Sequence, residues 1–327
     1  MPPKRKRGDA GVDDGREKFR KRGDLGIYFS GTKADLALTV ENQRILLHQQ
    51  ILISRVGFFK EKLLAGTNYE ELEVDDSGIP AMNITTHNAK SVLLMVEFVY
   101  GEGMVEIMEY PTNEKRFIQD CILLFNLGHS FDIPDMVKYA ITHLGKYLSR
   151  KLKDICHYPL PRTSAAPREF MDDLEAGINK AQTAKAGITL HAQKNHPRRM
   201  LIDFLVVGGD VLVRDSTFRF NIGQDILPAA FLRDTFLAQT AREFQTPWMK
   251  KLMVRPGRLE KAAKSRGRCS GCQTLVAKDQ QVVFNPWSHE RLEHKYTQLC
   301  CGDCAKGMND EDGSGVWWDI FEDMKEE

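Results

Sequence analysis

The sequence predicts an α+β protein, with a folded N-terminal domain and a small C-terminal module that contains most of the cysteines. Three observations support this prediction. Residues 35–48 alternate between apolar and polar side chains, which is typical of a β-hairpin. Between residues 52 and 152, apolar side chains recur three and four positions apart, as they do along the buried face of a helix. Five of the seven cysteines lie between Cys269 and Cys304, where few other large apolar residues could form a core.

The composition limits the classes of protein to which the chain can belong. With 327 residues, of which 42% are hydrophobic, the chain is long enough for two or three domains. Its formal net charge of +1 gives no general attraction to nucleic acid or to a membrane surface. It has neither an apolar run of about 18 residues nor the apolar segment of a secretion signal. We therefore expect an intracellular protein with no membrane partner and with reduced cysteines.

Residues 1–24 are predicted to be a disordered basic tail. They contain nine Lys and Arg, five Asp and Glu, and almost nothing apolar, so they could not offset the entropy of ordering. The run from Pro2 to Arg7 matches a short nuclear import signal, which predicts a nuclear protein. The alternative is a solubilising tail on a cytoplasmic protein.

The segment 25–153 has the pattern of a folded domain. Residues 35–40 and 44–48 are expected to form the hairpin, and short strands are expected near residues 72–74 and 82–84. A helix should follow the hairpin directly, and three more helices should contain residues 92–99, 117–124 and 137–152. In the first of these helices, the buried stripe consists of Leu52, Val56, Phe59 and Leu63.

This order of elements, together with four stretches of sequence, resembles the BTB/POZ domain, and most closely the compact domains of fungal proteins. The stretches are Asp35-Leu36, which opens the first strand, and residues 47–59, 96–101 and 125–136, which match the motifs of the following helices. The resemblance covers residues 25–152. It implies a protein-interaction domain that binds itself or another protein, in transcriptional assemblies or as a substrate adaptor of a cullin-3 ubiquitin ligase.

Two features of this domain bear on its partners. In cullin-binding members, an acidic residue follows the first long helix at a position that Ala65 occupies here, and this departure disfavours cullin-3 binding. Asp35 and His48 occupy the paired polar positions of the family. They could form part of a binding pocket, but we favour a buried pair that fixes the hairpin on the first helix, because buried polar groups require partners.

The middle of the chain resembles no family. Residues 154–200 are rich in proline and polar side chains, and we interpret them as a linker with one or two short helices around residues 170–186. Residues 201–255 are predicted to form a small α+β block. Its apolar segments 201–207 and 211–213 flank Gly208-Gly209-Asp210, as in a hairpin, and residues 217–222 and 225–241 suggest a third strand and a helix.

The strongest chemical signal is a pair of Cys-x2-Cys motifs, within a module at 256–327 that has a basic lead-in and an acidic tail. The motifs supply Cys269, Cys272, Cys301 and Cys304, which we predict to hold one structural zinc ion per chain. The 28 residues between Cys272 and Cys301 would need a hairpin around residues 282–284 and a loop. Alternatives are a redox-active pair or buried thiols, and Cys300, His289 or His294 could replace a cysteine ligand.

The sequence predicts no enzymatic activity. His289 and His294 are five positions apart, whereas a metalloprotease helix needs two histidines four apart. Four thiolate ligands would also leave a zinc ion no open position for substrate. The chain lacks the phosphate-binding, nucleophile-elbow and dinucleotide-binding glycine motifs.

These observations favour a protein-interaction adaptor or scaffold, with the zinc module for a second partner and a homodimer as one form of self-association. The alternative is a nucleic-acid-binding transcription or chromatin regulator. Residues 255–268 contain six Lys and Arg and one Glu, and they could contact phosphates. The eight acidic residues from Asp310 onward disfavour this alternative, because they would repel the same phosphates.

Overall fold

The computed structural model describes residues 18–64, 73–74, 77–109, 114–155, 157–158, 168–183, 196–212, 216–224, 226–240, 268–269, 272–275, 282–284 and 299–301. The chain forms two compact units. The first comprises residues 1–113 and 123–139, and the second comprises residues 114–122 and 140–327. Within the described ranges, no helix has both the length and the apolar content that a membrane crossing requires.

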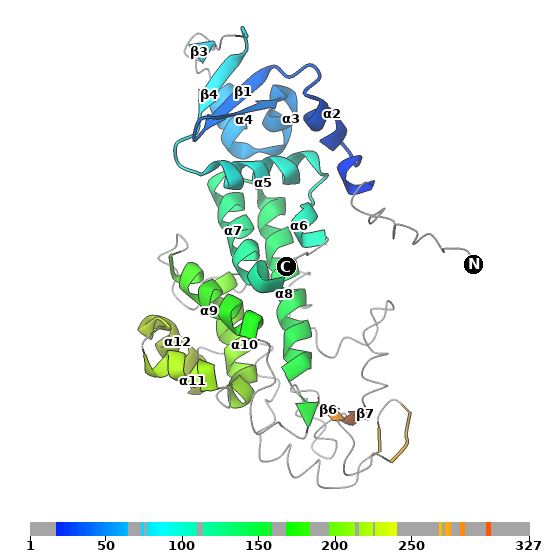
Figure 1. Cartoon of the computed structure of the whole chain (residues 1–327), viewed down its shortest axis with the longest axis vertical. Coiled ribbons are helices and arrows are strands. Elements are labelled where there is room, and N and C mark those ends of the chain that lie inside the picture. The colour runs from blue at the N-terminus through cyan, green and yellow to red at the C-terminus, as the bar shows by residue number, and fades with distance from the viewer. Residues whose placement is uncertain are drawn as a thin grey trace, which may run out of the picture. The chain divides into compact units, whose positions relative to one another are not determined.

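The first unit contains a four-stranded sheet in the order β2-β1-β4-β3 (Figure 1). The expected hairpin is confirmed, because β1 (Leu36–Val40) pairs antiparallel with β2 (Gln43–Leu47). Glu41 and Asn42 both have positive φ angles, as the two central residues of a type I′ turn require. β4 (Pro80–Asn83) pairs in parallel with β1, and β3 (Glu73–Val74) pairs antiparallel with β4.

Two short helices follow the hairpin where the sequence predicts one. α3 (Gln49–Arg55) and α4 (Gly57–Leu64) are separated by Val56, whose backbone is extended. All four residues of the predicted stripe are nevertheless buried. Gly57 explains the break. Its N–H donates to the Asp132 carbonyl at 3.1 Å, and the Asp132 side chain lies where a Cβ atom on residue 57 would stand.

The next helix, α5 (Ala89–Tyr100), begins where the Asn88 side chain accepts a hydrogen bond from the Ser91 N–H. Nine of its twelve residues are buried, so this is an interior helix. In Figure 1, α5 runs across beneath α3 and α4. α6 (Glu106–Glu109) and the 3-10 turn η2 (Glu114–Arg116) follow.

Two long helices, α7 (Phe117–Ser130) and α8 (Pro134–Ile155), confirm the last two helices that the sequence predicts for the N-terminal domain. The sequence expects a domain boundary at residue 153, whereas the two compact units divide elsewhere. The chain divides within α7, after Ile122, and within α8, after Tyr139. The lower limit is wrong, since Phe19 and Leu25 are both buried and residues 18–24 therefore belong to the folded protein.

Four helices occupy the region that the sequence assigns to a linker and an α+β block. They are α9 (Arg168–Thr183), α10 (Pro197–Leu212), α11 (Ser216–Gly223) and α12 (Ala229–Thr240). The predicted hairpin at 201–213 and the third strand at 217–222 are therefore wrong, whereas the helix expected in 225–241 is confirmed. A short apolar run fits a strand and a buried helix equally well, and residues 201–206 are buried on every side.

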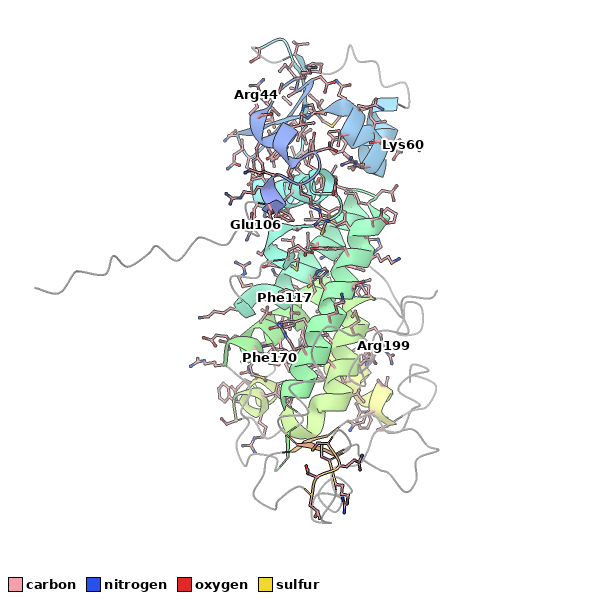
Figure 2. All side chains as sticks on the ribbon, turned by 90° about the vertical axis from the view of Figure 1, so that its right-hand side faces the viewer. Arg44, Lys60, Glu106, Phe117, Phe170 and Arg199 are labelled. Atoms are coloured by element: carbon pink, nitrogen blue, oxygen red, sulfur yellow. The ribbon has the colours of Figure 1, made fainter. Side chains whose placement is uncertain are left out.

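The core of the second unit contains a row of aromatic rings. Phe117 stacks on Tyr147 with ring centroids 4.5 Å apart, and Tyr147 lies 6.2 Å from Phe170, which in turn lies 5.9 Å from Phe204 (Figure 2). The row joins residues of α7, α8, α9 and α10, so α9 is a core helix. The helix expected around residues 170–186 is therefore confirmed, whereas its assignment to a linker is wrong. The unit also contains a small antiparallel sheet of β5 (His157–Tyr158), β6 (Val282–Phe284) and β7 (Leu299–Cys301).

Candidate functional site

The first Cys-x2-Cys motif lies in a tight hairpin. Arg268 and Leu275 form an antiparallel bridge, and the Cys269 N–H donates to the Thr274 carbonyl at 2.9 Å. The chain reverses at Gln273, whose φ is 60° and whose N–H donates to the Cys269 carbonyl at 2.9 Å. A tight turn between two cysteines is what a Cys-x2-Cys motif requires if both thiolates are to reach one ion.

The two cysteines of this hairpin have different surroundings. Cys269 is buried and Cys272 is exposed, with its Sγ 2.7 Å from the Thr274 hydroxyl. A hydroxyl at this distance can donate a hydrogen bond to a thiolate, as the second shell of a metal site often does. The Arg268 side chain also donates a hydrogen bond to the Gln273 carbonyl at 3.2 Å, which further stabilises the hairpin.

The second motif begins on a strand. β7 pairs with β6, which places Cys301 opposite Val282 and Cys300 opposite Val283. The sequence expects a hairpin around residues 282–284, whereas the structure has a single strand there, β6, which pairs with β5 and β7. Neighbouring residues of a strand belong to opposite faces of a sheet, so Cys300 and Cys301 cannot serve a metal on one face together. This alternation is consistent with one ligand from the pair.

The complete ligand set stays a prediction. Cys304, His289 and His294 lie outside the described residues. Among the residues that are described, no group of three or more His, Cys, Asp or Glu side chains is placed to hold a metal ion.

In the first unit, Asp35 and His48 both support the start of α3, but through different partners. The Asp35 carboxylate accepts a hydrogen bond from the Gln49 N–H at 2.7 Å, so it caps the helix from the neighbouring strand. The Gln49 side chain returns a hydrogen bond to the Asp35 carbonyl at 2.8 Å. The expected buried pair is therefore wrong, because Asp35 is exposed, His48 is half-buried, and Asp35 pairs with Gln49.

His48 contacts Tyr100, a buried residue at the end of α5. The His48 N–H donates to the Tyr100 hydroxyl at 2.8 Å, and the ring Nδ1 lies 3.2 Å from the same oxygen. The ring Nε2 lies 2.9 Å from the Thr32 carbonyl, which can only accept, so Nε2 holds the hydrogen. Burial raises the pKa of Tyr100 to about 12, and its hydroxyl therefore stays protonated at neutral pH.

Sequence reasoning missed the surface of α2 (Leu25–Ser30), for which the sequence predicts no helix. Leu25 is fully buried, and the Tyr28 ring packs against Tyr100 with centroids 5.4 Å apart. Ile27 and Phe29 face solvent, with exposed fractions of 43% and 61%. A six-residue helix has fewer than two turns and gives almost no periodic signal, which explains why the sequence does not predict it.

Sequence reasoning also missed the buried charges of the second unit. Asp173 on α9 accepts hydrogen bonds from the backbone N–H of Ile118 at 2.8 Å and of Gln119 at 3.4 Å, at the start of α7. Burial raises the pKa of Asp173 to about 6. Arg199 and Asp203, one turn apart on α10, form a buried ion pair at 2.9 Å. Asp173 links α9 to the start of α7, whereas Arg199 and Asp203 pair within α10, where two charged residues in an otherwise apolar stretch were the available signal.

No family model matches the sequence, and no curated protein matches it.

Proposed function

We propose that this protein is a non-enzymatic adaptor that binds other proteins through a BTB/POZ-like domain at residues 25–152. The order of the elements is the observation that supports the proposal. An antiparallel hairpin is followed by the helix pair α3–α4, by a strand that returns parallel to β1, and by α5, α7 and α8. This is the order that the resemblance to BTB/POZ domains implies, and it occurs over the residues that show the resemblance.

The exposed face of α2 is the surface that we propose for partner binding. An exposed aromatic side chain beside an apolar neighbour is the kind of anchor that dominates the energetics of protein interfaces. Phe29 and Ile27 provide such a pair, and the packing of Tyr28 and Leu25 on the domain holds the helix in place.

A matched pair of substitutions tests this proposal. Phe220 on α11 of the second unit has the same exposed fraction as Phe29, namely 61%. If α2 binds partners, Phe29→Ser in the full chain abolishes self-association in sedimentation, or the capture of a defined partner, whereas Phe220→Ser preserves it. Equal behaviour of the two variants, or an effect of Phe220→Ser alone, would remove α2 as the interaction surface.

We propose in addition that the protein is nuclear and that Cys269, Cys272, Cys301 and Cys304 hold one structural zinc ion. The hairpin at 268–275 supports the zinc proposal, because its hydrogen bonds bring the first motif into a turn suited to two thiolates. The basic run from Pro2 to Arg7 supports the nuclear proposal. Binding of nucleic acid through 255–268 gains no support from the described residues, of which only Arg268 belongs to that segment.

A further inference from the structure

A second basic cluster follows the predicted import signal. After Lys6 and Arg7 come ten residues, and then the segment 18–22, in which four of five residues are Lys or Arg. Two basic residues, a spacer of this length and a second basic cluster are the pattern of a bipartite import signal. A carrier that binds both clusters at once would need the segment in extended form and two acidic sites that attract the clusters.

The structure holds this second cluster against the first unit. Residues 18–20 form a helical turn, and Phe19 is buried with an exposed fraction of only 5%. The Arg22 N–H donates to the Phe19 carbonyl at 2.9 Å, and the Leu25 N–H donates to the Arg22 carbonyl at 3.1 Å. The segment is therefore folded back on itself, which is incompatible with an extended groove.

The basic side chains of this segment contact acidic residues of the same unit. The guanidinium of Arg20 lies 3.4 Å from Glu106, which Figure 2 labels, and that of Arg22 lies 3.2 Å from Glu102. Asp24, two residues after the segment, pairs with Arg55 at 2.6 Å. Glu102 and Glu106 thus contact the two guanidinium groups that the acidic site of a carrier would have to bind.

We infer that residues 4–7 and 18–22 form one bipartite import signal and that the folded domain masks its second half. This inference rests on the proposed nuclear import and adds a mode of regulation to it. The carrier can bind both clusters only after residues 18–22 leave the domain, so its apparent affinity falls by the fraction of chains in which they are released. Exposed ion pairs contribute little to stability, so the burial of Phe19 is the main obstacle to release.

Phe19→Ala in the full chain tests the masking, because it weakens the docking and removes no basic residue. Two quantities are measured: the rate of trypsin cleavage after Arg20, Lys21 and Arg22 in the purified protein, and the nuclear-to-cytoplasmic ratio of a fluorescent fusion. We expect both to rise severalfold. Glu102→Gln/Glu106→Gln, which removes the two ion pairs, should raise both by a smaller factor, and it replaces Phe19→Ala if that variant fails to fold. Glu169→Gln, which removes an exposed ion pair with Lys115 in the second unit, should change neither.

Two further variants separate the masking from the import itself. Lys6→Ala/Arg7→Ala should reduce the ratio to that of the fluorescent protein alone, and an unchanged ratio would overturn nuclear import together with this inference. Arg20→Ala/Arg22→Ala, added to Phe19→Ala, should remove the gain in the ratio. If Lys6→Ala/Arg7→Ala lowers the ratio but Phe19→Ala leaves the ratio or the cleavage rate unchanged, import stands and the masking is refuted.

Discussion

Arg199 and Asp203 are one turn apart on α10 and buried, whereas Arg168 and Asp172 are one turn apart on α9 and exposed, with side-chain exposures of 86% and 60%. The two pairs have the same chemistry, so they isolate the effect of burial. Truncating one partner of a buried pair costs about 3 to 5 kcal/mol, because the other charge is left without compensation, while an exposed pair contributes about 0.3 to 0.5 kcal/mol.

We therefore predict that Arg199→Ala lowers the free energy of unfolding by several kcal/mol above neutral pH, where Asp203 is charged, and that Arg168→Ala hardly changes it. The loss for Arg199→Ala should shrink at low pH. Burial raises the pKa of Asp203 to about 7, and removal of the Arg199 charge leaves a carboxylate that becomes neutral still more readily. Urea unfolding followed by circular dichroism measures both variants, and equal losses would show that burial does not distinguish the pairs.

Asp173 predicts a dependence of stability on pH. Its pKa is about 6 in the folded protein, against an ordinary value of 3.8, chiefly because of burial. A carboxyl group whose pKa is raised on folding contributes stability below its unfolded pKa, and this contribution is lost as the pH rises through the folded pKa.

Asp173→Asn retains an acceptor for the Ile118 N–H but cannot titrate. Between pH 4 and pH 7, the free energy of unfolding of the native protein should fall by about 1 to 3 kcal/mol relative to that of Asp173→Asn. Urea unfolding of both proteins across this range measures the difference. Parallel pH profiles would mean that Asp173 titrates normally.

At the scale of elements, the close approach of Gly57 to Asp132 separates α3 from α4. A methyl group at position 57 would displace the Asp132 side chain and the turn that holds it, so Gly57→Ala should lower the free energy of unfolding by about 1 to 3 kcal/mol. Gly26 on α2 has open space around its Cβ position. Gly26→Ala should therefore be neutral or stabilising by up to about 1 kcal/mol. Thermal melting compares the two, and a neutral Gly57→Ala would contradict the close approach.

The same element shows what periodicity can and cannot predict. The spacing of Leu52, Val56, Phe59 and Leu63 identified four buried residues correctly, because residues three and four positions apart lie on the same side of a helix. It could not identify the break at Val56, which depends on a contact with residue 132 that lies far away in the sequence. For residues 201–207 periodicity gave the wrong element, because residues buried on every side have no polar face to reveal the period.

For the whole molecule, the sequence pattern predicted the individual helices and strands better than the composition predicted the domain boundaries. α7 and α8 both contribute residues to the two units, whereas the sequence offers a boundary only at the proline-rich segment after residue 153. The first cysteine motif lies in a hairpin, and the second begins at the end of strand β7. Both are local features, which the spacing of the cysteines along the sequence can specify. The buried charges of α9 and α10 depend on the packing of helices from distant parts of the chain.

Removal of the zinc ion is the prediction that applies to the whole molecule. The purified protein should contain one zinc per chain, and Cys301→Ser should lose it, whereas Cys300→Ser, the matched control on the opposite face of β7, should retain it. Binding free energies of about 10 to 16 kcal/mol for structural zinc exceed what the few large apolar residues of 266–321 could supply, so chelation should unfold this module.

The two parts of the chain should respond differently to chelation. Trp287, Trp317 and Trp318 lie in the module, so their emission should shift towards that of exposed tryptophan. Most of the helical circular dichroism should persist, because the packing of α5, α7, α8, α9 and α10 depends on buried apolar side chains and not on the metal. A protein purified under reducing conditions with no zinc, or one in which Cys300→Ser rather than Cys301→Ser releases the ion, would show that the ligand set is wrong. Collapse of the helical signal together with the tryptophan shift would show that the metal stabilises the whole chain and not the module alone.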